Sequence, residues 1–199
     1  MIDTPYILDL VTAPVGQVIT VQDMTAFGYV VEPEQFGVLG DCIDAATKVV
    51  EGDSGRQLLT ATYDVHWRRF PGAWGELVLP RVPVASVTSV KYYDAAGTQQ
   101  TLSALLYTVN DGSAHASAYI MPAFNEQWPT TYGHDRDVTV RFVCGYGDRE
   151  DIPKPLKLQV AILSMGLFRE RMPQACSSSN GPSMVFQVLS QFNRHQEFV

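Results

Sequence analysis

Apolar residues recur every three or four positions in two stretches of the chain, the spacing that places them on one face of an α-helix. In the first stretch, about residues 34–51, these positions are Phe36, Leu39, Ile43, Ala46 and Val50. In the second, about residues 154–171, they are Leu156, Val160, Leu163, Leu167 and Phe168. Pro155 suits the first turn of a helix, and Gly52 and Gly55 end the first stretch. We therefore predict an amphipathic helix in each stretch.

Residues 1–33 carry one local signal. Thr20 is a good N-cap residue, and Asp23 stands at the third helical position, where its carboxylate can return the hydrogen bond. This pair predicts a short helix after Thr20. The other residues of this region carry no signature from which a role can be assigned.

Between the two long helices the pattern changes to short runs rich in β-branched and aromatic residues, which favour strands. The clearest runs are residues 60–67, 76–80, 87–93, 98–102, 106–109, 118–122 and 138–143. The turn Asp94-Ala95-Ala96-Gly97 predicts a hairpin between two of them. The predicted fold class is α+β, in which N-terminal and C-terminal helices pack as a small bundle. Residues 57–147 form an insertion, either a central antiparallel β-sheet or a small barrel.

Length and composition fit one folded domain with an appendage. Of the 199 residues, 46% are hydrophobic and 18% are charged, which excludes a disordered chain. We assign residues 1–175 to a single α+β domain, residues 176–182 to a serine-rich linker and residues 183–199 to a short amphipathic segment. No apolar run of about 18 residues occurs, so no membrane span is expected.

The N-terminus and the cysteines bear on the compartment. Residues 1–5 lack the basic start and apolar core of a signal peptide. Cys42, Cys144 and Cys176 form no CxxC pair and no cluster with histidine, which excludes a disulfide framework and a zinc knuckle. Cys42 and Cys144 are most simply packing residues. We expect a reduced protein made in the cytoplasm.

Charge is unevenly spread along a chain whose net charge is −7. Residues 1–59 hold nine acids and two bases, whereas residues 153–199 hold five bases and two acids. Oppositely charged ends favour head-to-tail self-association or docking onto an acidic partner. Sequence-specific DNA readout is not expected, because DNA-binding proteins carry a positive surplus.

No constellation of catalytic residues is found. The sequence lacks the GxSxG, HExxH and GxxxxGK[ST] patterns, and Gly145-Tyr146-Gly147 is best explained as a turn. His134 with Asp135 and Asp137 could ligate a cation, but a solvated loop is the favoured interpretation. We therefore assign no catalytic, metal-binding or cofactor-binding residues and expect no cofactor.

Two groups of apolar residues are candidates for contacts. Phe70, Trp74 and Trp128 lie in turns rich in proline and glycine, where they are either lids over the sheet or anchors of a subunit interface. The C-terminal segment either folds back on its own core or docks onto a partner. Its candidate docking residues are Val185, Phe186, Leu189, Phe192, Arg194 and Phe198.

The order of these segments resembles the head–tail connector (adaptor) proteins of long-tailed bacteriophages and of gene transfer agents. The resemblance covers about 130 of the 199 residues, in order. It is carried by residues 45–58, 76–87, 90–94, 119–122, Trp128-Pro129, 138–147 and 152–171. Each piece is weak alone, whereas the ordered set is fairly specific.

The resemblance implies a structural protein and no enzyme. Such proteins form a ring, commonly twelvefold, beneath the portal at the capsid vertex, and DNA passes through without sequence-specific binding. It implies that the C-terminal segment docks onto the portal protein and that a stopper or terminator protein binds on the tail side. The expected location is the capsid–tail junction of a virion assembled in the bacterial cytoplasm, away from any membrane.

Two other interpretations stay open. One is another tail or baseplate component built on the same β-rich centre. The other is a small carbohydrate-binding or hydrolase domain, which would need at least two of Trp67, Trp74 and Trp128 coplanar in one cleft beside a carboxylate.

Overall fold

The computed structural model describes residues 6–112 and 117–171, which form two compact units. The β unit is built from the chain up to residue 15 and from residues 59–146. The helical unit is built from residues 16–58 and from the chain after residue 146. The stretch expected to be a single domain thus contains two units, each assembled from two separate parts of the chain.

The helical unit contains α1 (Val21–Ala26), α2 (Phe36–Ser54) and α3 (Lys154–Arg171), with the 3₁₀ turns η1 (Pro33–Gln35) and η3 (Arg149–Asp151). The predicted capping box is present at α1. The hydroxyl of Thr20 accepts a hydrogen bond from the Asp23 N–H at 3.2 Å, and the Asp23 carboxylate accepts one from the Thr20 N–H at 2.7 Å. All three predicted helices are confirmed.

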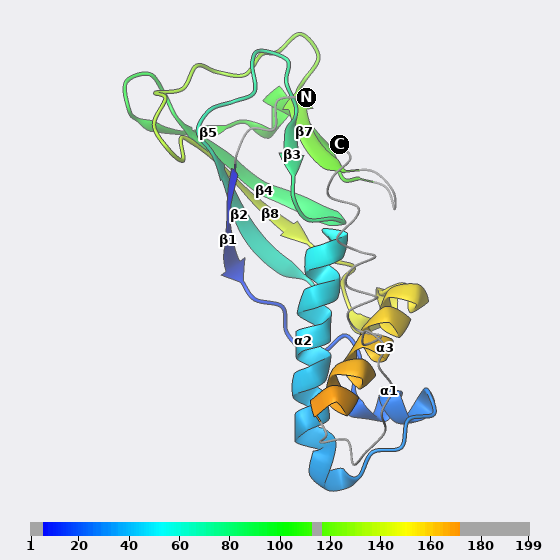
Figure 1. Cartoon of the computed structure of the whole chain (residues 1–199). Helices are drawn as coiled ribbons and strands as arrows, with labels where there is room; N and C mark the ends of the chain where they lie inside the picture. Colours follow the sequence, from blue (N-terminus) through cyan, green and yellow to red (C-terminus); the bar gives the residue numbers. More distant parts are fainter. Residues whose placement is uncertain (1–5, 113–116, 172–199) are drawn as a thin grey trace, which may run out of the picture. The chain divides into compact units, whose positions relative to one another are not determined.

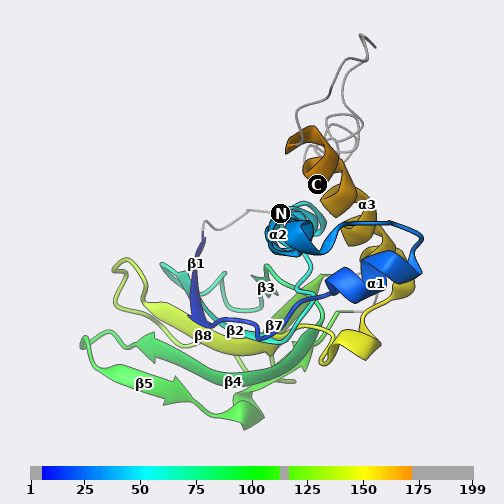
Figure 2. The ribbon, with the colours of Figure 1, turned by 90° about the horizontal axis from the view of Figure 1, so that it is seen from below.

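α2 and α3 lie side by side within this unit (Figure 1, Figure 2). Their predicted apolar stripes supply the buried residues Leu39, Ile43, Ala46, Val50, Val160, Leu163 and Phe168. Near the end of α3, the Arg169 guanidinium lies 6.0 Å from the centre of the Tyr29 ring. Tyr29 precedes η1 and α2 in the sequence. The two helices therefore run antiparallel (Figure 1).

The β unit contains two antiparallel sheets. The first has the order β1-β2-β8-β4-β5, formed by β1 (Tyr6–Thr12), β2 (Ala61–Trp67), β8 (Val138–Cys144), β4 (Val84–Tyr93) and β5 (Gln99–Leu102). The second has the order β3-β7-β6, formed by β3 (Leu77–Leu79), β7 (Ala118–Pro122) and β6 (Tyr107–Asn110), with the 3₁₀ turn η2 (Ala104–Leu106) before β6. Among the described residues, the first sheet ends at β1 and β5 without closing. The predicted sheet is confirmed, and the barrel alternative is wrong.

Alternation along the central strands places one face of the first sheet in the core of the β unit. On β2 every second residue from Ala61 to Trp67 is buried. Tyr63 on β2 stands opposite Phe142 on β8, and their ring centres are 6.1 Å apart. Inward residues of the second sheet, among them Leu77 and Ile120, belong to the same core cluster.

The turn signals in the β region are confirmed where the structure describes them. In the β4–β5 hairpin the Gly97 N–H donates to the Asp94 carbonyl at 2.8 Å, and the Asp94 carboxylate accepts from the N–H groups of Ala96 and Thr98. After β8, Gly145 has a φ of 124°, and a Cβ at this position would lie 2.7 Å from the Leu59 backbone. Only glycine fits so close to another backbone segment.

β1 is an element that the sequence did not indicate. It carries apolar residues on both faces, so the two-residue alternation that marks a half-buried strand is weak. No helix among the described residues is long and apolar enough to cross a membrane.

Candidate functional site

The loop around His134 takes part in backbone structure. Asp137 is buried, and its carboxylate accepts hydrogen bonds from the N–H groups of Gly133 and His134. The His134 Nδ1 lies 2.9 Å from the carbonyl oxygen of Asp135. In the described part of the chain, no three His, Cys, Asp or Glu side chains are grouped to hold a metal ion. His134 and Asp135 are exposed, whereas Asp137 is buried, so only part of this group matches the favoured interpretation of a solvated loop.

Cys42 in α2 and Cys144 in β8 are both buried, as expected of packing residues. Cys176 lies outside the described residues.

Two of the three candidate interface aromatics lie in the core of the β unit. Phe70 and Trp128 are buried and stack with ring centres 4.6 Å apart and planes 7° apart. The Trp128 Nε1 donates to the Gly75 carbonyl at 2.7 Å. Phe70 and Trp128 therefore cover the core. Trp74 is 60% exposed and stays a predicted interface residue.

The carbohydrate-binding interpretation needs at least two accessible tryptophans in one cleft. Trp67 and Trp128 are both buried in the β unit, and only the Trp74 ring is exposed. The three tryptophans, all of which lie in the described part of the chain, therefore provide no pair of exposed rings, which disfavours this carbohydrate-binding interpretation.

The predicted portal-docking residues all lie outside the described residues. They are Val185, Phe186, Leu189, Phe192, Arg194 and Phe198. Their role stays a prediction.

Several ion pairs lie on the outer face of the first sheet. Arg141 on β8 donates to both carboxylate oxygens of Asp64 on β2, at 2.8 and 2.7 Å. Asp9 on β1 pairs with Arg136 at 3.0 Å, and its carboxylate lies 3.3 Å from the His66 Nε2. These pairs link β1, β2 and β8, so we assign them a role in the stability of the β unit.

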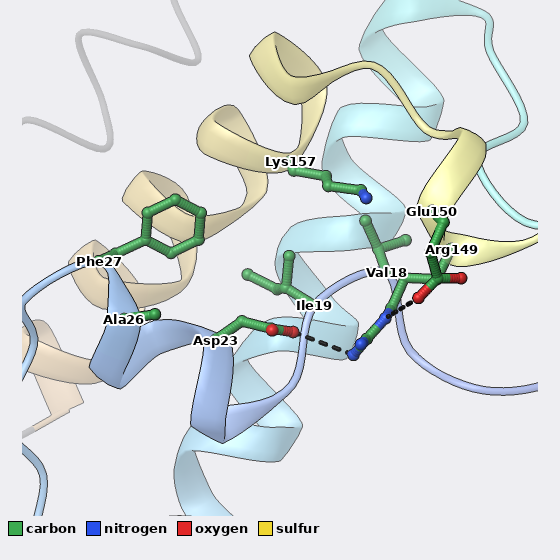
Figure 3. A pocket seen from close by; sticks show the side chains of 8 residues that line it. All are labelled: Val18, Ile19, Asp23, Ala26, Phe27, Arg149, Glu150 and Lys157. Carbon is green, nitrogen blue, oxygen red and sulfur yellow. Dashed lines mark hydrogen bonds and ion pairs between the residues drawn. The ribbon is translucent and has the colours of Figure 1, made fainter.

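A shallow pocket of about 170 Å³ lies in the helical unit between α1, η3 and α3 (Figure 3). Val18 and Ile19 form its buried floor, and Asp23 pairs with Arg149 across it at 3.0 Å. Partial burial opposes the charge on Asp23, but hydrogen bonds from Thr20 and the nearby cations Arg149 and Lys157 outweigh it and lower the Asp23 pKa. The ion pair thus fastens η3 to α1.

The β unit also exposes two large apolar side chains that the sequence did not single out. Leu105 in η2 and Phe124 after β7 are 86% and 93% exposed. They flank the residues joined by the hydrogen bond from the Ala123 N–H to the Leu106 carbonyl. Local periodicity could not reveal them, because both lie outside the strands.

Comparison by sequence finds no matching protein-family model and no matching curated protein. Comparison by structure does find similar chains. The chain is similar to one in the neck of a native gene transfer agent particle determined with C12 symmetry, at a TM-score of 0.65 and 23% identity, over 94% of each chain. It is also similar to a chain of the virion of a native gene transfer agent, at a TM-score of 0.70 and 21% identity, over 93% of this chain and 94% of that one.

A third similar structure is the neck of an empty gene transfer agent particle determined with C6 symmetry, at a TM-score of 0.66 and 21% identity. The likeness spans both the helical and the β unit, since 94% of the chain is covered. The chain therefore has the fold of a gene transfer agent neck protein, as the ordered sequence resemblance to head–tail connectors led us to expect.

Proposed function

We propose that the chain is a structural head–tail adaptor that forms a ring under the portal of a phage or phage-like particle and joins capsid to tail. The observation that carries this proposal is the likeness to a chain of a C12-symmetric neck over 94% of both chains. A full-length likeness matters here because it includes both units and the connections between them. The role is non-enzymatic, and assembly is the mechanism.

The charge of the chain suits a ring through which DNA slides. With a net charge of −7, the protein repels phosphates, whereas a basic channel would hold them. In the helical unit, residues 16–58 carry seven acids and two bases. We infer that the ring forms part of the DNA channel and makes no sequence-specific contacts.

We further propose that residues 183–199 dock onto the portal protein. The proposal rests on sequence alone, because the segment carries Phe186, Leu189, Phe192 and Phe198, too many apolar side chains for a tail that stays in water.

The test is native mass spectrometry of the 22.0 kDa chain, alone and mixed with portal rings from the same particle. A ring-sized complex on the portal is the expected result. A chain that stays monomeric with portal rings but binds tail subunits would overturn the adaptor role and favour another tail or baseplate component.

A further inference from the structure

β1 is only lightly anchored in its own sheet. It forms one edge of the first sheet and pairs with β2 (Figure 1). None of its seven residues is buried, and only Leu8 and Asp9 are half-buried. The other four strands of this sheet pair with one another without β1, so the sheet stays joined when β1 leaves its place.

β1 also carries apolar side chains on both faces that its own chain leaves in water. Ile7 and Val11 lie on the outer face, and Tyr6 and Leu10 lie on the same face as the buried residues of β2. These four side chains are between 44% and 51% exposed. Apolar residues on both faces are typical of a strand that is covered on both faces. The composition of β1 therefore fits a place between two bodies better than an open edge.

The connection from β1 into the helical unit is exposed to solvent. The β unit includes the chain up to Val15, and the helical unit begins at Gly16. Val15 is 90% exposed. Gly16 has a φ of 88°, and a Cβ at this position would meet no atom within 4 Å. Packing therefore does not hold this connection, and a change of its backbone angles can free β1 while both units stay folded.

We propose that β1 is exchanged between copies in the ring, so that β1 of one copy pairs with β2 of the next. The partner is a second copy of this chain, because β2 of every copy offers the same hydrogen-bond ladder that β1 uses within its own chain. Exchange of an identical element therefore needs no new complementary surface. Each copy gives one strand and receives one, as a closed ring requires. This inference rests on the proposed adaptor function and names a contact that interlocks the copies of its ring.

The exchange is compatible with pairing inside one chain when the protein is free. The β2 strand of the same chain is present at a high effective concentration, which favours the closed arrangement in dilute solution. Copies that gather on a portal ring are close to one another, and this proximity offsets the advantage. An exchanged β1 then lies between the copy that supplies it and the copy that receives it, where its exposed apolar side chains can be covered.

Disulfide trapping distinguishes exchange from pairing within one chain. Ile7 stands opposite His66 in the β1–β2 ladder, and opposite Cα atoms of an antiparallel pair lie about 4.5–5.5 Å apart, within the range of a disulfide. The full chain with Ile7→Cys and His66→Cys is assembled with portal rings, oxidised and run on a denaturing gel without reductant. We expect a series of covalent multimers from the ring and only monomers from the dilute free chain.

A second pair guards against loss of assembly through the substitution of His66. Thr12 and Thr62 are also opposite in the β1–β2 ladder, so Thr12→Cys with Thr62→Cys should give the same multimers. The matched control is Thr62→Cys with Val143→Cys, which are opposite in the β2–β8 ladder. Both of these strands lie within residues 59–146, so this bridge stays inside one chain and only monomers are expected. Each single cysteine variant measures multimers that arise from the three native cysteines.

The outcomes separate the exchange from the function. Multimers from the β1–β2 pairs, with monomers from the control, support the exchange. Rings whose chains all run as monomers overturn the exchange and leave the adaptor role standing. A wild-type chain that forms no ring, alone or with portal rings, overturns both.

Discussion

Asp64 and Arg141 show how a single pair of side chains links stability to pH. The two hydrogen bonds from Arg141, opposed by partial burial, hold the Asp64 pKa below its ordinary value of 3.8. A lowered pKa in the folded state means that the charged carboxylate stabilises the fold. This stabilisation is present in full above pH 3.8 and is lost as the pH falls through the lowered pKa.

We therefore expect Asp64→Asn to lower the free energy of unfolding by about 1 kcal/mol at pH 7. The difference from the wild type should vanish in strong acid, where both proteins carry an uncharged group. Thermal melts from neutral to acidic pH measure this. Asp135→Asn is the control, since Asp135 and Arg68 are largely exposed and 3.8 Å apart. An unchanged melting temperature of Asp64→Asn at pH 7 would contradict the expectation.

Gly145 is the residue whose backbone position most restricts substitution. Its φ of 124° is unfavourable for other residues, and a Cβ would meet the Leu59 and Thr60 backbone at under 3.0 Å. Gly145→Ala should cost at least about 2 kcal/mol of stability in chemical denaturation. Gly37→Ala, in the open first turn of α2, should instead be neutral or stabilising. Equal effects of the two substitutions would refute the steric argument.

At the scale of elements, α3 is the part of the helical unit with two distinct apolar faces. One face packs Val160, Leu163 and Phe168 into the unit, and the other exposes Leu158 and Ile162. Because the residues are neighbours in sequence, substitution of one face at a time separates folding from association.

Leu163→Asp should destabilise the helical unit by at least about 3 kcal/mol, because Leu163 is only 5% exposed and an unpaired charge would be buried. Ile162→Asp, one position earlier, should leave the melt nearly unchanged. Circular dichroism melts of both variants compare the two faces. A cooperative, unshifted melt of Leu163→Asp would show that the stripe is assigned to the wrong face.

At the scale of the whole molecule, two compact units share one chain that crosses between them near residues 15, 58 and 146. Each unit has its own buried residues, so each can contribute a separate contact surface to an assembly. The proposed portal contact lies in residues 183–199, and the predicted subunit-interface residue Trp74 lies in the β unit.

Deletion of residues 183–199 is accordingly expected to leave the melting temperature and the ring unchanged, while attachment to capsids is lost. Cosedimentation of the truncated protein with tailless capsids measures attachment. Normal attachment of the truncated chain would end the docking hypothesis.

The sequence by itself determined the elements that depend on local physics. Helical periodicity located α2 and α3, the Thr20–Asp23 pair located α1, and the Asp94–Gly97 turn located the β4–β5 hairpin. In each case the residues that decide the structure are close neighbours in the chain. The α+β class followed from the same local patterns.

Only the tertiary structure decided which distant segments meet. β1 pairs with β2 although residues 13–60 lie between them, and this choice depends on burying apolar surface, which no local pattern encodes. The same holds for the candidate surfaces: Phe70 and Trp128 are buried and Trp74 exposed, although all three lie in similar turns. The sequence alone did not show that Leu158 and Ile162 of α3 stay in water. The packing of α3 against α2 decides which of its two apolar faces is exposed, because exposure is a property of the fold and not of the sequence.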